Sequence, residues 1–212
     1  ADTSGRKRPW IFSFSVMYVI GAAGLWFTLP DGSNMYWMLA LFSIGFIGAE
    51  YALIFINSQL PDLGNEDEVG EISGSGFAFG YIGGLVALII VLVLFAEQGG
   101  GKTIAGLAPG VGLLDAEARE GTRAVGPITA IWFIIFMVPY FRWVHEPLSE
   151  RVLGTFSDAM GSLRKTLGKL KHRRSLLNFL ISSMLYRDAL NGIYTFGGIY
   201  AFNVLDWTVP QV

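Results

Sequence analysis

Cysteine is absent from the 212 residues of this chain, which excludes disulfide bonds, thiolate chemistry and cysteine-ligated metals. Charge is also scarce, because 15% of the residues are charged, whereas a soluble domain carries about 25%. Histidine occurs only twice, and 52% of the residues are hydrophobic. Together with a mean hydropathy of +0.49, this composition is typical of a membrane protein.

Long apolar stretches take up most of the chain. Each is about as long as an α-helix needs to cross the ~30 Å hydrocarbon core, at about 1.5 Å per residue. The sequence therefore predicts an all-α fold, a polytopic bundle of membrane helices. The five predicted helices cover residues 10–29, 34–57, 72–96, 126–143 and 176–205.

Basic residues predict the orientation of these helices. Arg6, Lys7 and Arg8 precede the first stretch, and the loop at residues 144–174 is rich in Lys and Arg. The positive-inside rule places both segments in the cytoplasm. The loop at residues 58–71 then also lies in the cytoplasm, although its charges are all acidic. The loop at residues 97–125 lies outside.

Two acidic residues lie inside the predicted spans. Glu50 is in the second stretch, and Asn57 shares its face because it lies seven residues further on. Asp188 is in the fifth stretch, where Asn191 shares its face and Arg187 is adjacent. An ionisable side chain at such depth is costly, so we expect it to have a partner or a task. We interpret these five residues as a substrate or proton pathway.

Three of these residues have an alternative interpretation. Glu50 would otherwise be neutralised by a basic residue of another helix and hold the bundle together. Asn57 would otherwise cap the end of its helix. Arg187 would either hold a carboxylate of the solute or neutralise Glu50 or Asp188.

A glycine stripe runs along the third stretch. Gly76, Gly80 and Gly84 are four residues apart and therefore share one face of the helix. Missing side chains allow a neighbouring backbone to approach closely. We predict that this stripe packs against another helix of the same bundle, either as a fixed seam or as one that slides.

The predicted cytoplasmic loop contains an amphipathic pattern of its own. Apolar residues recur there at helical spacing, with basic residues between them, which predicts a helix lying on an anionic membrane surface. The alternative is a linker helix that packs on the protein. The apolar residues are Phe156, Met160, Leu163, Leu167 and Leu170, and the basic ones are Arg164, Lys165, Lys169 and Lys171.

Two enzyme-like patterns are excluded by their setting. Residues 99–103 are similar to a phosphate-binding loop, but they follow a membrane helix and are predicted to lie outside. Ser75 lies between two glycines, as in intramembrane serine proteases, but His145 and His172 fall in or beside the cytoplasmic linker and cannot serve as its base. The sequence shows no cofactor or metal-binding pattern and no nucleic-acid motif. We therefore expect no enzyme activity.

Several segments resemble signatures of known transporters. Residues 2–8 resemble the end of the major facilitator loop motif, and by that resemblance Asp2, Gly5 and Arg6 belong to a gating loop. Residues 54–61, 73–84 and 185–191 resemble three signatures of one branch of that superfamily. That branch is the vacuolar amino-acid effluxer family, which is linked to autophagy in fungi and has uncharacterised bacterial relatives.

This resemblance implies a twelve-helix major facilitator fold, of which the chain would be an interior piece covering helices three to seven. Residues 1–143 would belong to the N-terminal six-helix bundle, residues 144–174 to a cytoplasmic linker, and residues 175–212 to the start of the C-terminal bundle. The protein would be a multi-pass membrane protein, in the inner membrane of a bacterium or the vacuolar membrane of a fungus.

The function that the resemblance implies is secondary active transport by alternating access. The transported solutes would be small and polar, with amino acids favoured, and protons are the candidate coupling ion. The partners would thus be a small solute and membrane lipids. Because a fold does not determine a function, the alternative is a non-transporting receptor or assembly protein built on a transporter fold.

Overall fold

The structure is a computed structural model that describes residues 6–65, 67–98, 100–144, 146, 156–170 and 172–207, with backbone alone at residues 156 and 159. The described residues form six α-helices and three short 3-10 helices, without any strand. The predicted all-α fold is therefore confirmed. The chain divides into two compact units, Ala1–Arg151 and Val152–Val212.

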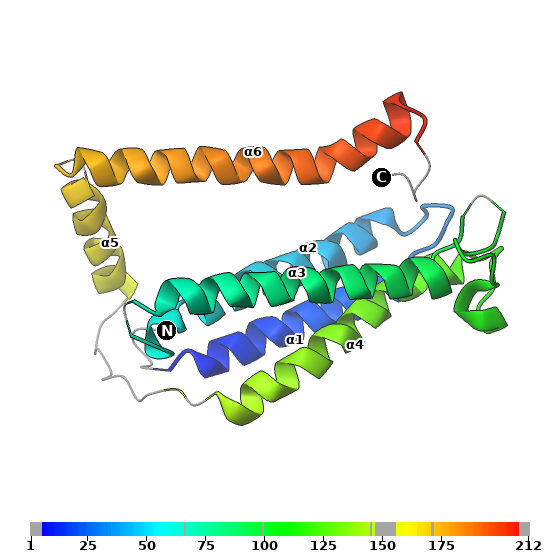
Figure 1. Cartoon of the computed structure of the whole chain (residues 1–212), viewed down its shortest axis with the longest axis horizontal. Coiled ribbons are helices and arrows are strands. Elements are labelled where there is room, and N and C mark those ends of the chain that lie inside the picture. Colours follow the sequence, from blue (N-terminus) through cyan, green and yellow to red (C-terminus); the bar gives the residue numbers. More distant parts are fainter. Residues whose placement is uncertain are drawn as a thin grey trace. The chain divides into compact units, whose positions relative to one another are not determined.

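The described residues of the first unit contain four long helices, which are labelled in Figure 1. Short 3-10 helices follow the first three of them: η1 (Leu25–Phe27), η2 (Leu60–Asp62) and η3 (Pro109–Gly112). By length and composition, all four long helices are suited to crossing a membrane. They are α1 (Arg8–Gly24), α2 (Met35–Asn57), α3 (Val69–Leu94) and α4 (Glu120–Trp143).

The second unit contains α5 (Phe156–Leu170) and α6 (Arg174–Val204). α6 has 31 residues, which is long enough for a membrane span, and it covers the fifth predicted stretch. However, only the four helices of the first unit are apolar enough to be candidate spans among the described residues. Polar side chains such as Arg187, Asp188 and Asn191 interrupt the apolar sequence of α6. Four predicted spans are thus confirmed, and the fifth stays a prediction.

Glycines allow α1 and α2 to pack backbone against backbone. A Cβ atom added to Gly48 would lie 2.5 Å from the backbone nitrogen of Tyr18 and 2.7 Å from the carbonyl oxygen of Phe14. A Cβ atom on Gly21 would likewise run into the backbone of Gly45. Such small-residue contacts are how helices approach closely in membranes. We call this contact between Gly21, Gly45 and Gly48 the glycine seam.

The fourth helix packs on the other side of α1. Gly126 faces the carbonyl oxygen of Ala22, and a Cβ atom at this glycine would clash with that oxygen. Further along the same contact, the rings of Tyr18 and Phe133 lie 4.6 Å apart between their centroids. Figure 1 shows α1, α2 and α4 running beside one another. By contrast, α3 contains no buried residue, so α1, α2 and α4 form the core of this unit.

Candidate functional site

The second helix has two unlike faces. Gly45 and Gly48 are on the buried face that packs against α1. Glu50 and Asn57 lie on another side of the helix and are exposed, as is Ser43, seven residues before Glu50. In the described part of the chain, the side chains of Glu50 and Asn57 have no hydrogen-bond or ion-pair partner. We call Ser43, Glu50 and Asn57 the polar stripe.

Sequence reasoning found two members of the polar stripe and missed Ser43. The seven-residue spacing that linked Glu50 with Asn57 also links Ser43 with Glu50, and this was the available signal. The Ser43 hydroxyl donates a hydrogen bond to the carbonyl oxygen of Leu39, 2.7 Å away. That bond satisfies its proton and leaves the lone pairs of its oxygen available as acceptors.

The remaining pathway residues lie on α6 of the second unit. Arg187, Asp188 and Asn191 are all exposed, and they fall near the middle of a continuous helix. Asp188 and Asn191 share a face because they are three residues apart, and Arg187 is the neighbour of Asp188 in sequence. α6 therefore carries an acid, an amide and a guanidinium within little more than one helical turn.

The start of α1 is joined to the ends of α2 and α4 by polar contacts. The Lys7 ammonium donates a hydrogen bond to the carbonyl oxygen of Ser58 at 2.8 Å and forms an ion pair with Asp62 at 3.4 Å. The side chains of Lys7 and Asp62 are 30% and 37% exposed. Because solvent screens the charges, this ion pair contributes at most about 1 kcal/mol to stability. Even so, the contacts connect the start of α1 with the end of α2.

Glu146 connects the same end of α1 with the segment that follows α4. Its carboxylate accepts hydrogen bonds from the backbone N–H groups of Lys7 and Arg8, the latter at 3.1 Å. A carboxylate is favourable there because the first N–H groups of a helix lack partners within the helix. The Arg8 guanidinium in turn donates to the carbonyl oxygen of Phe141 and lies 6.0 Å from the centre of its ring. We call Lys7, Arg8, Asp62 and Glu146 the end cluster.

The end cluster lies next to the predicted gating loop. Arg6 directly precedes Lys7, whereas Asp2 and Gly5 lie outside the described residues. Sequence reasoning did not identify Glu146, because an acid that caps a helix more than a hundred residues away leaves no local pattern. Close by, the Tyr140 hydroxyl donates to the buried side-chain oxygen of Gln59 at 2.5 Å, which joins the ends of α4 and α2.

A second acid caps a helix at the opposite end of the unit. The Glu97 carboxylate accepts hydrogen bonds from the backbone N–H groups of Gly121 at 2.7 Å and Thr122 at 2.8 Å, in the first turn of α4. Burial raises the pKa of Glu97, but hydrogen bonds from Thr122 and Gly121 outweigh it, so the pKa lies below its ordinary value of 4.5. Nearby, Arg123 donates to the carbonyl oxygen of Trp26 at 2.9 Å.

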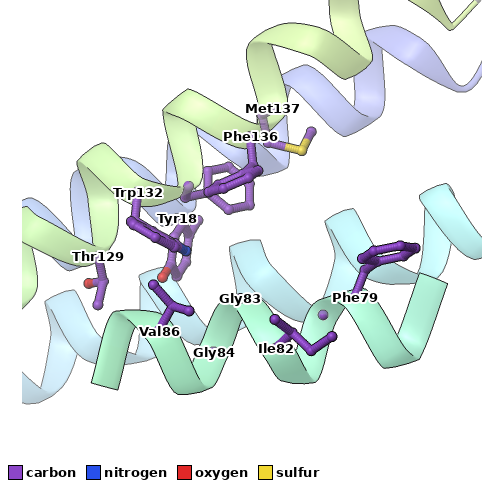
Figure 2. A pocket seen from close by; sticks show the side chains of 12 residues that line it. Tyr18, Phe79, Ile82, Gly83, Gly84, Val86, Thr129, Trp132, Phe136 and Met137 are labelled. Atoms are coloured by element: carbon purple, nitrogen blue, oxygen red, sulfur yellow. The ribbon is translucent and has the colours of Figure 1, made fainter. Parts of the chain in front are cut away.

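Two residues of the predicted glycine stripe of α3, Gly80 and Gly84, line a hollow. Figure 2 shows Gly83, Gly84 and Val86 of α3 on one side of it and Trp132 of α4 on the other. The hollow has a volume of about 660 Å³, and its lining is almost entirely aliphatic, aromatic or glycine. This lining suits hydrocarbon or another helix better than a polar solute.

Apart from the adjoining residues and backbone of α3 itself, no described atom lies within 4 Å of a Cβ atom built on Gly76, Gly80 or Gly84. The helix packing that we predict for this stripe therefore needs a partner outside the described residues, and it stays a prediction. As for metals, the described residues contain no group of three His, Asp or Glu side chains placed to hold an ion.

Comparisons with known proteins cover the whole chain. The family described as "Vacuole effluxer Atg22 like" matches residues 1–212. The chain is also 25% identical over 209 residues to a protein of Bacillus subtilis (strain 168) named "Uncharacterized MFS-type transporter YxiO". That similarity covers 94% of this chain and 44% of the relative, so the chain spans less than half of its length. No solved structure matches the chain.

Proposed function

Since this chain belongs to the Atg22-like family of vacuole effluxers, which are membrane transporters, we propose that the whole protein moves small polar solutes by alternating access. Amino acids are the solutes that we favour. The family name supports an effluxer, and the name of the Bacillus relative supports a transporter of the major facilitator type.

The polar stripe of α2 is the observation that carries this proposal. α2 is an apolar helix suited to a membrane span, yet Ser43, Glu50 and Asn57 recur every two turns on one side of it. An ionised carboxylate facing lipid would be costly, and such residues in membrane helices generally face a bundle interior or a water-filled cavity. The glycine seam holds another face of α2 against α1, so the stripe faces away from that contact. We assign the stripe to the wall of the solute pathway.

The residues of α6 carry chemistry that suits an amino acid. A free amino acid carries one carboxylate and one ammonium group. Arg187 offers a planar pair of donors that fits a carboxylate, while Asp188 and Glu50 offer acceptors for the ammonium group or for a coupling proton. Asn191 and Asn57 supply neutral donors and acceptors for orientation. In this assignment Arg187 binds the solute, and Asp188 either binds it or carries the proton.

Transport by the purified full-length protein in lipid vesicles tests the proposal. We expect radiolabelled amino acids to accumulate when the same amino acid is loaded on the other side, as counterflow requires. If no amino acid or other polar solute shows counterflow with folded protein, the transport function is wrong, and the non-transporting alternative takes its place.

The variant Asp188→Asn tests the role of the acid. If Asp188 carries a coupling proton, the variant loses accumulation driven by a proton gradient but retains solute exchange, because exchange moves no net proton. If Asp188 binds the solute, both activities fall. Asp206→Asn is the matched control, since Asp206 is an exposed acid just beyond the end of α6. Gradient-driven uptake at the normal rate by folded Asp188→Asn protein would contradict both roles.

A further inference from the structure

The helix α5 has a continuous apolar face that is exposed. Met160, Leu163 and Leu167 lie at helical spacing, and their side chains are 52%, 53% and 58% exposed. Leu170 continues the same face at the end of the helix, and Phe156 begins it in the sequence. Three exposed aliphatic side chains on one side of a short helix are unfavourable in water and favour a covering surface.

The charge of this segment indicates what kind of surface covers it. Arg164, Lys165 and Lys169 are exposed on α5, and Asp158 is the acid of the same helix. The segment after the helix adds more positive charge, because Arg173 and Arg174 line a hollow of about 720 Å³ at the start of α6. A helix that is apolar on one side and basic overall fits an anionic membrane surface.

The connection to α6 determines the depth of α5. Only three residues separate the two helices, and the N–H groups of His172 and Arg173 donate hydrogen bonds back to the carbonyl oxygens of Lys169 and Leu170. Figure 1 shows α5 in yellow meeting the start of α6 in orange at a sharp bend. If α6 crosses the membrane, as we predict, the end of α5 lies at the level of the lipid headgroups.

We propose that α5 lies on the cytoplasmic leaflet and binds anionic lipid headgroups. The apolar face enters the boundary between headgroups and acyl chains, to a depth of about 5–10 Å. Arg164 borders that face, so its guanidinium reaches lipid phosphates directly. Lys165 and Lys169 lie on the far side of a helix about 10–12 Å thick, and the Debye length of about 8–10 Å keeps them within the attraction of the surface. This binding goes beyond the proposed transport function and does not depend on it.

Spin labels on the full-length protein in vesicles test the position of α5. The chain has no cysteine of its own, so single cysteines introduced here give unambiguous labels once any cysteine elsewhere in the protein is replaced. Labels at Leu163→Cys and Leu167→Cys should be accessible to oxygen dissolved in lipid but protected from a water-soluble nickel chelate. The matched label at Ser162→Cys, on the polar side of the same helix, should show the opposite preference.

The lipid composition tests the electrostatic part of the proposal. Vesicles of phosphatidylcholine alone are compared with vesicles in which one third of the lipid is phosphatidylglycerol. We expect the immersed population of α5 to increase with phosphatidylglycerol and to decrease with salt. Replacing Arg164, Lys165 and Lys169 with glutamine should reduce the ratio of immersed to free helix by about fivefold per residue in the anionic vesicles.

Three results would overturn the proposal. If labels at Leu163, Leu167 and Ser162 are all accessible to the nickel chelate, α5 lies in water. If the labels at Leu163 and Leu167 are protected from both oxygen and the chelate, α5 packs on protein instead of lipid. If immersion is the same in both kinds of vesicle and the glutamine variant has no effect, anionic headgroups are not what α5 binds.

Discussion

The glycine seam gives the sharpest prediction for stability, because the effect of one added methyl group follows from the structure. In the variant Gly48→Ala, the new Cβ atom would lie 2.5 Å from the backbone nitrogen of Tyr18, whereas ordinary contact begins at 3.4 Å. α1 and α2 must therefore separate by about 1 Å, because backbone atoms cannot rotate away. A gap of that size forfeits a quarter to a half of each dispersion contact along the seam. We expect a loss of about 1–3 kcal/mol in the free energy of unfolding.

Two further variants provide the comparison. A Cβ atom at Gly45 would first meet Gly21 at 3.3 Å, so Gly45→Ala should cost less than Gly48→Ala. Gly161→Ala in α5 is the control, because nothing lies within 4 Å of its added methyl group. Alanine should stabilise that helix by about 0.5–1 kcal/mol, since glycine loses more backbone entropy on folding.

Unfolding of the full-length protein in mixed detergent micelles, followed by circular dichroism, measures these differences. The expected order of stability is Gly161→Ala, the unaltered protein, Gly45→Ala and then Gly48→Ala. If Gly48→Ala is as stable as Gly161→Ala, α1 and α2 do not touch at this seam and the packing described for the first unit is wrong.

Three other predictions follow from the caps, the loops and the stripe of α3. Glu97→Gln should lower the free energy of unfolding by about 1 kcal/mol at about pH 7. Because the pKa of Glu97 in the folded protein lies below 4.5, the stability difference between the two proteins should vanish as the pH falls through that lower value. A stability difference that does not change with pH would contradict the charge interaction. An impermeant thiol reagent added outside whole cells should label the exposed site Lys102→Cys and spare the exposed site Asp67→Cys, and the reverse pattern would invert the topology. Gly80→Leu should lower the free energy of unfolding of the full-length protein by about 1–3 kcal/mol, or impair its transport, if the stripe packs on a helix outside the described residues. Unchanged thermal stability and uptake would place the stripe against lipid.

Apolar stretches predicted the positions of the long helices well, because burial of backbone polar groups in lipid leaves few alternatives to a helix. The start of α4 is the largest deviation. The apolar pattern begins at Gly126, but the helix begins six residues earlier at Glu120. Those residues are too polar to be recognised as part of a span, and they become helical because Glu97 caps them from another segment. Such a cap is a tertiary contact that a local pattern does not contain.

The glycines show a similar division between local and tertiary information. Spacing alone identified Gly76, Gly80 and Gly84 as a stripe, and it gave no sign of which helix faces them. Gly45 and Gly48 lie three residues apart, which also places them on one face, yet Gly45 meets Gly21 and Gly48 meets the backbone of Tyr18, both on another helix. Sequence spacing thus predicts which residues share a face, while the partner of that face depends on how the helices are arranged.

The arrangement of contacts on α2 has a consequence for the transport mechanism that we propose. Glu50 is two residues from Gly48, so the helix that carries the polar stripe is fixed to α1 through the seam. The end cluster joins the end of α2 to α1, and Glu146 and Gly126 join α1 to α4. For α2 to move alone, all of these contacts would have to break together, so α1, α2 and α4 should rock as one body. α3 has no buried residue and is therefore the described helix of this unit that is freest to shift relative to the polar stripe.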